Sequence, residues 1–223
     1  MEKVKKPVVK ICCISSVGEA LTAIEFGASA LGLVSKMPSG PGIISDDLIV
    51  EIVKIIPPEI DSFLLTSEIK AEKIISQHEK IGTNTIQIVD EIDIKEYSIL
   101  KKEIPEIKIV QVIHVVDDSS IDIAKRVSEF ADAILLDSGN PALEIKLLGG
   151  TGKVHNWEIS RKIRDSVKIP LYLAGGLNSE NVTDAIRTVK PYGVDLCSGV
   201  RTNGFLDREK LKNFFDKVNL FKY

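Results

Sequence analysis

Two side chains that could donate or accept a proton stand at the ends of apolar runs, far apart in the chain. Cys12 closes the run of residues 8–12, and Asp137 follows the run of residues 133–136. A thiolate is a competent base and a carboxylic acid a competent proton donor, so the pair could act on one small substrate. Each residue also has a structural interpretation, because a free cysteine often packs as a small apolar residue and an aspartate often caps a loop.

Glycines cluster at three places in the last third of the sequence. The clusters are Gly149-Gly150-Thr151-Gly152, Gly175-Gly176 and Ser198-Gly199. Glycine allows backbone N–H groups to approach an anion closely, and a following helix adds a favourable dipole. Three tight turns are the alternative, but three clusters at successive strand ends favour a phosphate site. We expect it to comprise Gly150, Thr151, Gly152, Gly175, Gly176, Ser198 and Gly199.

These residues are separated by regular alternation of apolar runs and amphipathic segments. The predicted strands cover residues 8–12, 30–34, 62–65, 85–89, 107–115, 133–136, 171–174 and 194–197, and a helical pattern follows each of them. Eight strand–helix pairs predict an α/β fold, a single (β/α)8 TIM barrel that forms one domain over residues 1–223. A doubly wound open sheet is the alternative, but its Gly-x-Gly-x-x-Gly turn is absent after the first strand.

A barrel would bring the carboxyl ends of its strands to one face, where the catalytic residues of such folds lie. Cys12 and Asp137 would then face each other across the mouth, beside the phosphate site. Lys10 shares a strand face with Cys12 because side chains alternate, and its charge could favour the thiolate. Gln87 lies in the fourth predicted strand and is a candidate substrate contact. Cys13 and Cys197 are interpreted as packing residues.

Composition excludes several classes of function. The chain has 223 residues and a formal net charge of −3, which gives no indication of nucleic-acid binding. Three cysteines form neither a zinc spacing nor an even disulfide framework, so we expect no metal and a reducing compartment. No leader pattern and no apolar stretch of about 18 residues occurs, so we expect a cytoplasmic protein without membrane contact.

The motifs together resemble the phosphoribosylanthranilate isomerase family over about 200 residues. They are Lys10-Ile11-Cys12, Leu135-Leu136-Asp137-Ser138, Gly149 to Lys153, Leu173 to Asn178 with Asn181-Val182, and Val194-Asp195 with Ser198-Gly199-Val200. The resemblance implies an Amadori rearrangement of a phosphoribosyl aminosugar in tryptophan biosynthesis, with no cofactor. Asp137 would be the general acid that opens the sugar ring, and Cys12 the general base at C2. The expected partner is a small sugar phosphate, bound by a monomer or a homodimer.

The chain departs from the family on the side that would hold the anthranilate group. The family carries a Ser-Pro-Arg element after the second strand, whereas this chain reads Met37-Pro38-Ser39-Gly40 and has no arginine there. Lys36 and Arg201 are the candidate substitutes for binding a substrate carboxylate. Two other functions stay open: an isomerase of a different phosphoribosyl adduct, and a phosphate-ligand binding protein without turnover.

Overall fold

Eight parallel strands form a closed barrel in a computed structural model of the chain, which describes residues 6–138 and 156–221. The strands are β1 (Val8–Ile11), β2 (Ala30–Val34), β3 (Asp61–Thr66), β4 (Thr85–Ile88), β5 (Lys108–His114), β6 (Ala133–Asp137), β7 (Leu171–Leu173) and β8 (Gly193–Leu196). Each pairs with the next in sequence, and β8 pairs with β1. The predicted (β/α)8 barrel is therefore confirmed.

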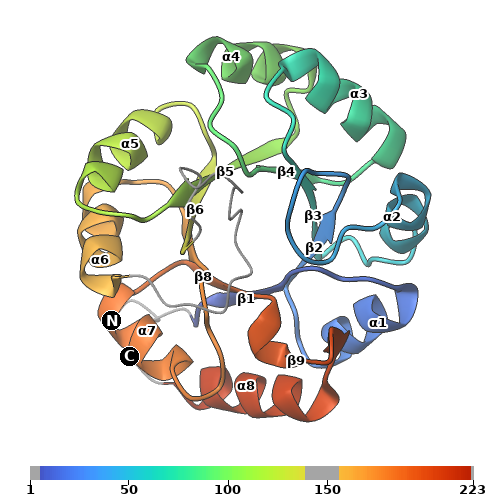
Figure 1. The fold of residues 1–223 in the computed structure, drawn as a ribbon, viewed down its shortest axis with the longest axis vertical. Helices are drawn as coiled ribbons and strands as arrows, with labels where there is room; N and C mark the ends of the chain where they lie inside the picture. The colour runs from blue at the N-terminus through green and yellow to red at the C-terminus, as the bar shows by residue number, and fades with distance from the viewer. Residues whose placement is uncertain (1–5, 139–155, 222–223) are drawn as a thin grey trace.

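Eight helices surround the barrel, and the view down its axis shows them as an outer ring (Figure 1). They are α1 (Val17–Glu25), α2 (Asp46–Val53), α3 (Ala71–Ile81), α4 (Ile94–Glu103), α5 (Ser119–Val127), α6 (Trp157–Ser166), α7 (Val182–Val189) and α8 (Arg208–Leu220). Local sequence sets several of their ends. Ser16 and Ser45 cap α1 and α2 with side-chain oxygens, and Gly82 ends α3 at a φ of 78°.

Alternation along the strands divides the core into two layers. In β3, Leu64 packs in the layer that also contains helix residues such as Ala20 and Ile49, whereas Phe63 and Leu65 pack in the barrel interior. The interior holds side chains from strands on all sides and is filled rather than open. Burial on both faces explains why the strands read as continuous apolar runs.

A short element after β8 was not among the predicted ones. A 3-10 turn, η1 (Ser198–Val200), leads into a two-stranded antiparallel ribbon of β9 (Arg201–Thr202) and β10 (Phe205–Leu206). The ribbon lies against α1 and precedes α8 (Figure 1). Within residues 6–138 and 156–221, no helix has the length and apolar character needed to cross a membrane.

Candidate active site

A pocket opens at the carboxyl ends of the strands, the face on which barrels of this kind carry their sites. Its apolar wall comes from side chains of β2 to β6 and from the loop after β2. Its polar groups come from the ends of β1, β4, β6 and β8 and from the loop after β7. The polar groups and glycines that line the pocket are those of Cys12, Cys13, Gly40, Gln87, Asp137, Gly175, Gly176, Asp195, Cys197 and Ser198.

Cys12 and Asp137, the predicted base and acid, both line this pocket. Cys12 directly follows β1, and its N–H donates to the carbonyl of Leu196, which ties it to β8. Asp137 ends β6, where its backbone carbonyl accepts from Val115 and its carboxylate accepts from the N–H of Ser138 at 2.7 Å. Both side chains are buried, with 6% and 9% exposure, so neighbouring strands fix their positions.

Beneath Cys12, a fully buried ion pair joins the first and last strands. Lys10 Nζ lies 2.9 Å from Asp195 Oδ1 and 5.1 Å from the centre of the Phe63 ring. Burial opposes the charged form of Lys10, but the Asp195 carboxylate outweighs it and raises the pKa of the ammonium above its ordinary value. A methyl group at Gly32 would lie 2.8 Å from Cys12 Sγ and 3.0 Å from Lys10 Nζ, so the ammonium is a close neighbour of the thiol.

The glycine loops after β7 and β8 lie together at the rim. Gly175 and Gly176 adopt φ angles of 82° and 64°, which other residues rarely do. The side-chain amide of Asn181, at the start of α7, donates to the Gly176 carbonyl at 2.9 Å and holds this turn. Gly199 packs so closely against the carbonyl of Leu177 that no side chain would fit there. Gly150, Thr151 and Gly152, the remaining predicted phosphate residues, lie outside the described residues.

Gln87 and Lys36 are placed differently with respect to the pocket. Gln87 lines it from β4, is buried, and has no hydrogen-bond partner for its Oε1 atom among the described residues. A buried acceptor without a donor is costly, which makes this oxygen a natural contact for a bound polar group. Lys36 is exposed at the start of the loop whose Met37 and Pro41 line the pocket.

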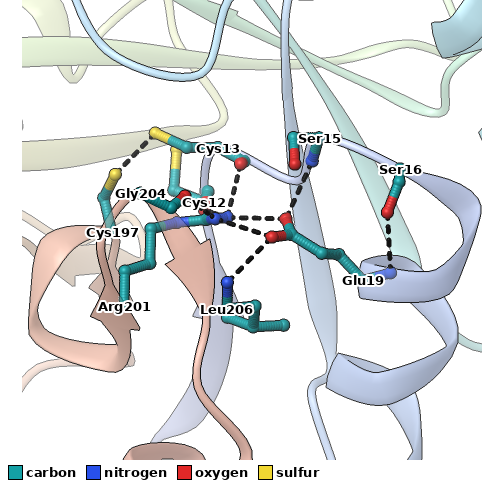
Figure 2. Close-up of polar contacts among 9 residues, drawn as sticks. All are labelled: Cys12, Cys13, Ser15, Ser16, Glu19, Cys197, Arg201, Gly204 and Leu206. Atoms are coloured by element: carbon teal, nitrogen blue, oxygen red, sulfur yellow. Dashed lines mark hydrogen bonds and ion pairs between the residues drawn. The ribbon is translucent and has the colours of Figure 1, made fainter.

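Arg201 is occupied by protein groups. Its guanidinium forms a two-pronged ion pair with Glu19, at 2.9 and 3.0 Å, and also donates to the carbonyls of Gly204 and Cys13 (Figure 2). The pair is nearly buried, with 8% and 11% side-chain exposure. Burial opposes ionisation of Glu19, but the Arg201 hydrogen bonds outweigh it and lower the pKa of the carboxyl. Arg201 lines a side cavity next to the pocket, together with Ser15 and Gly204.

Three residues matter to this site beyond what the sequence assigned to them. Asp195 received no role, although a charged residue inside an apolar strand is a signal of an interior partner. Cys13 and Cys197 were interpreted as packing residues, yet both line the pocket, and their Sγ atoms lie 2.7 Å apart. Among the described residues, no group of three or more His, Cys, Asp or Glu side chains is arranged to hold a metal ion.

A family model described as N-(5'-phosphoribosyl)anthranilate (PRA) isomerase matches residues 9–217. The chain belongs to this family. A protein named N-(5'-phosphoribosyl)anthranilate isomerase 2, from Methanosarcina mazei, is 38% identical over 212 residues, which cover 94% of this chain and 93% of that one. The resemblance of the sequence motifs to the phosphoribosylanthranilate isomerase family is thereby confirmed.

Solved structures of the family share the fold. Phosphoribosyl anthranilate isomerase from Thermotoga maritima matches with a TM-score of 0.82 and 30% identity, covering 96% of this chain and 98% of that one. A structure of phosphoribosyl anthranilate isomerase in complex with reduced 1-(o-carboxyphenylamino)-1-deoxyribulose 5-phosphate matches with a TM-score of 0.79, 28% identity and the same coverage.

Proposed function

We propose that this chain isomerises N-(5'-phosphoribosyl)anthranilate to the corresponding aminodeoxyribulose phosphate in tryptophan biosynthesis, with Asp137 as acid and Cys12 as base. The observation that carries the proposal is the meeting of these two side chains in one pocket, beside the glycine loops after β7 and β8. Membership of the isomerase family supports the reaction class. We also propose that the protein is cytoplasmic, as we expect of an enzyme of amino-acid biosynthesis.

The first step is opening of the furanose ring. Asp137 donates a proton to the ring oxygen, the bond from C1 to that oxygen breaks, and the nitrogen lone pair forms a protonated Schiff base at C1. The ring oxygen keeps the proton as a hydroxyl group. A positioned proton donor accelerates such a step by about 10²–10⁴-fold.

The second step removes the proton from C2. Cys12 accepts it as a thiolate, and the electron pair forms the C1–C2 double bond and neutralises the Schiff base. The resulting enolamine gains a proton at C1 and loses the proton of its C2 hydroxyl, which yields the ketone. The Lys10 ammonium, held by Asp195, lies next to the Cys12 thiol and places positive charge where this base acts.

The substrate phosphate would lie at the rim formed by Gly175, Gly176, Ser198 and Gly199. The turn after β7 has its glycines in left-handed conformations, and η1 begins at Ser198, separated from the end of β8 by one residue. The backbone N–H groups of these two segments are the donors that we assign to the phosphate. The unpaired Oε1 of Gln87 would accept a hydrogen bond from a substrate N–H or hydroxyl group. Gly150, Thr151 and Gly152 remain candidates for the same phosphate.

Lys36 is the cation that we assign to the anthranilate carboxylate. Arg201 is committed to Glu19, whereas no described residue forms an ion pair with Lys36. Buried Ser35, which donates to Asp46 at 2.7 Å and accepts from Gln77 at 2.6 Å, anchors the start of this loop. The lysine therefore projects from a fixed point beside the pocket.

The test is conversion of phosphoribosylanthranilate, followed by loss of its anthranilate-type fluorescence. The wild type should turn over, and Cys12→Ser and Asp137→Asn should each lower kcat by about 10²–10⁴-fold. Asp47→Asn, an exposed carboxylate at the start of α2, is the control and should retain wild-type kcat. Near-normal turnover in either pocket variant would remove that residue from the mechanism. A folded wild type that does not turn over this substrate would instead indicate a different phosphoribosyl adduct.

A further inference from the structure

Cys13 and Cys197 come from opposite ends of the chain and meet at the rim of the pocket. Cys13 is the second residue after β1, and Cys197 directly follows β8, the strand that pairs with β1 to close the barrel. Their Sγ atoms lie 2.7 Å apart, joined by a thiol hydrogen bond (Figure 2). A disulfide has an S–S distance of about 2.05 Å, so forming one needs only a small closing movement.

The loop around Cys13 holds its thiol in place. Cys13 has a φ of 61°, a left-handed conformation that favours glycine over cysteine. The backbone at Gly42 packs against it so closely that a methyl group there would lie 2.4 Å from Cys13 Cβ. Arg201 also donates to the Cys13 carbonyl. These contacts leave the side chain little freedom to turn away from Cys197.

The two thiols differ in access and in acidity. Both thiols line the central pocket and the side cavity with Arg201, but Cys13 is buried whereas Cys197 is partly exposed. The hydrogen bond with Cys13, assisted by the charge of Arg201, lowers the pKa of Cys197. The neighbouring thiols and burial raise the pKa of Cys13. Cys197 is therefore the more exposed and the more acidic of the two thiols, and the one that we expect a small oxidant to reach first.

We propose that Cys13 and Cys197 form a redox modification site, which hydrogen peroxide converts to an intramolecular disulfide and a thiol reductant restores. The Cys197 thiolate attacks one peroxide oxygen, the O–O bond breaks, and the leaving hydroxide takes up a proton to become water. The product is a sulfenic acid on Cys197. Cys13 then attacks that sulfur and displaces a second water. Two thiols are oxidised, one peroxide is reduced, and two waters leave.

The bond would link the loop that carries Cys12 to the turn that begins at Ser198. Cys12 is the third thiol at this rim, and the nearest thiol to it in sequence is Cys13. A disulfide between Cys13 and Cys197 consumes the sulfenic acid before further oxidation and leaves the Cys12 thiol reduced. The proposal concerns this pair of thiols and stands whether or not Cys12 is a catalytic base.

The experiment treats the reduced full-length protein with hydrogen peroxide, then alkylates it under denaturing conditions and measures its intact mass. The untreated wild type should take up three labels, one for each cysteine, and the oxidised wild type one. Peptide mapping should show a link between Cys13 and Cys197, which dithiothreitol removes. Cys12→Ser should still form the link. The variants Cys13→Gly and Cys197→Ser should not form the link. Glycine is chosen at position 13 because it adopts the left-handed φ of Cys13 without strain.

Three outcomes would overturn the proposal. One is a mapped link that includes Cys12 in the wild type. A second is full labelling of all three cysteines after peroxide treatment. The third is accumulation of sulfinic acid on Cys197 while Cys13 stays free. Because mass and mapping read the bond directly on the wild type, a failure here is distinguishable from a failure of the proposed isomerase activity.

Discussion

At the scale of single residues, binding of the anthranilate carboxylate depends on which of two cations, Lys36 or Arg201, can turn towards the substrate. Arg201 donates to Glu19 and to the backbone carbonyls of Cys12, Cys13 and Gly204. Moving it to a substrate would leave a nearly buried carboxylate without its partner, which is strongly unfavourable. Lys36 is exposed and pays no such penalty when it turns towards a ligand. A flexible ammonium would bind a carboxylate less specifically than an arginine fork does.

Replacing Lys36 by alanine should therefore raise KM for phosphoribosylanthranilate more than it lowers kcat. The carboxylate is present in the ground and transition states alike, and a charge-assisted hydrogen bond contributes about 1.5–3 kcal/mol, which corresponds to roughly ten- to hundredfold in KM. Steady-state kinetics of Lys36→Ala give the answer, with Lys54→Ala at the far end of α2 as control. An unchanged KM would show that another group holds the carboxylate.

At the scale of elements, Glu19 fastens the loop after β1 to the ribbon after β8. Its carboxylate accepts from the N–H of Ser15 at 3.0 Å, from the N–H of Leu206 at 2.8 Å, and from Arg201 (Figure 2). The Ser16 hydroxyl accepts from the N–H of Glu19 and so caps the first turn of α1. The Glu19 side chain therefore holds the ribbon, while its backbone N–H belongs to the helix cap. The helix start, the ribbon and the rim of the pocket form one hydrogen-bonded unit.

Replacing Glu19 by glutamine should destabilise the protein by about 3–5 kcal/mol, because it leaves the Arg201 charge buried without its partner. Urea unfolding at pH 7 measures the loss. The control is Glu25→Gln. Glu25 lies on α1, as Glu19 does, but its ion pair with Arg208 of α8 is exposed, so this substitution should change stability little. Equal effects of the two substitutions would show that burial of the Glu19 pair contributes nothing.

The same carboxylate should make the wild type sensitive to acid. Since the folded-state pKa of Glu19 is below its ordinary value, its contribution is present above that ordinary value. It is lost as the pH falls through the lowered pKa. Unfolding free energies measured from neutral to acidic pH should therefore fall more steeply in the wild type than in Glu19→Gln.

At the scale of the whole molecule, the barrel closes through a pair of charges inside it. Lys10 and Asp195 face each other in register on β1 and β8, the first and last strands, and Lys10 is fully buried. Closure of the sheet removes both edges and buries the Lys10 ammonium completely, whereas Asp195, with 7% exposure, also lines the pocket. The ion pair thus joins the first strand to the last and also places a positive charge beside Cys12.

Replacing Lys10 by methionine should cost about 3–5 kcal/mol in unfolding free energy, because it leaves Asp195 buried without its cation. The double variant Lys10→Met with Asp195→Asn should be more stable than Lys10→Met alone. Lys108 pairs with Asp61 at the starts of β5 and β3, with side-chain exposures of 59% and 31%. Lys108→Met is therefore the matched control and should cost less than about 1 kcal/mol. A double variant less stable than the single one would contradict this account.

The sequence by itself determined the barrel and the residues at its mouth. Eight apolar runs, each followed by a helical pattern, are enough for the fold, because burial on both strand faces and right-handed crossovers leave few other arrangements. Strand ends meet on one face, so Cys12 and Asp137 could be placed together although they lie 125 positions apart in the chain. Local patterns in the chain carry that information.

Only the tertiary structure decided which partner each polar side chain takes. Arg201 and Lys36 were equivalent candidates in the sequence, and the ion pair with Glu19 distinguishes them. Asp195 contacts Lys10, and Cys197 contacts Cys13, only because the last strand pairs with the first. Such pairings depend on distances of a few ångströms between residues remote in the chain, and no periodicity of the sequence encodes those distances.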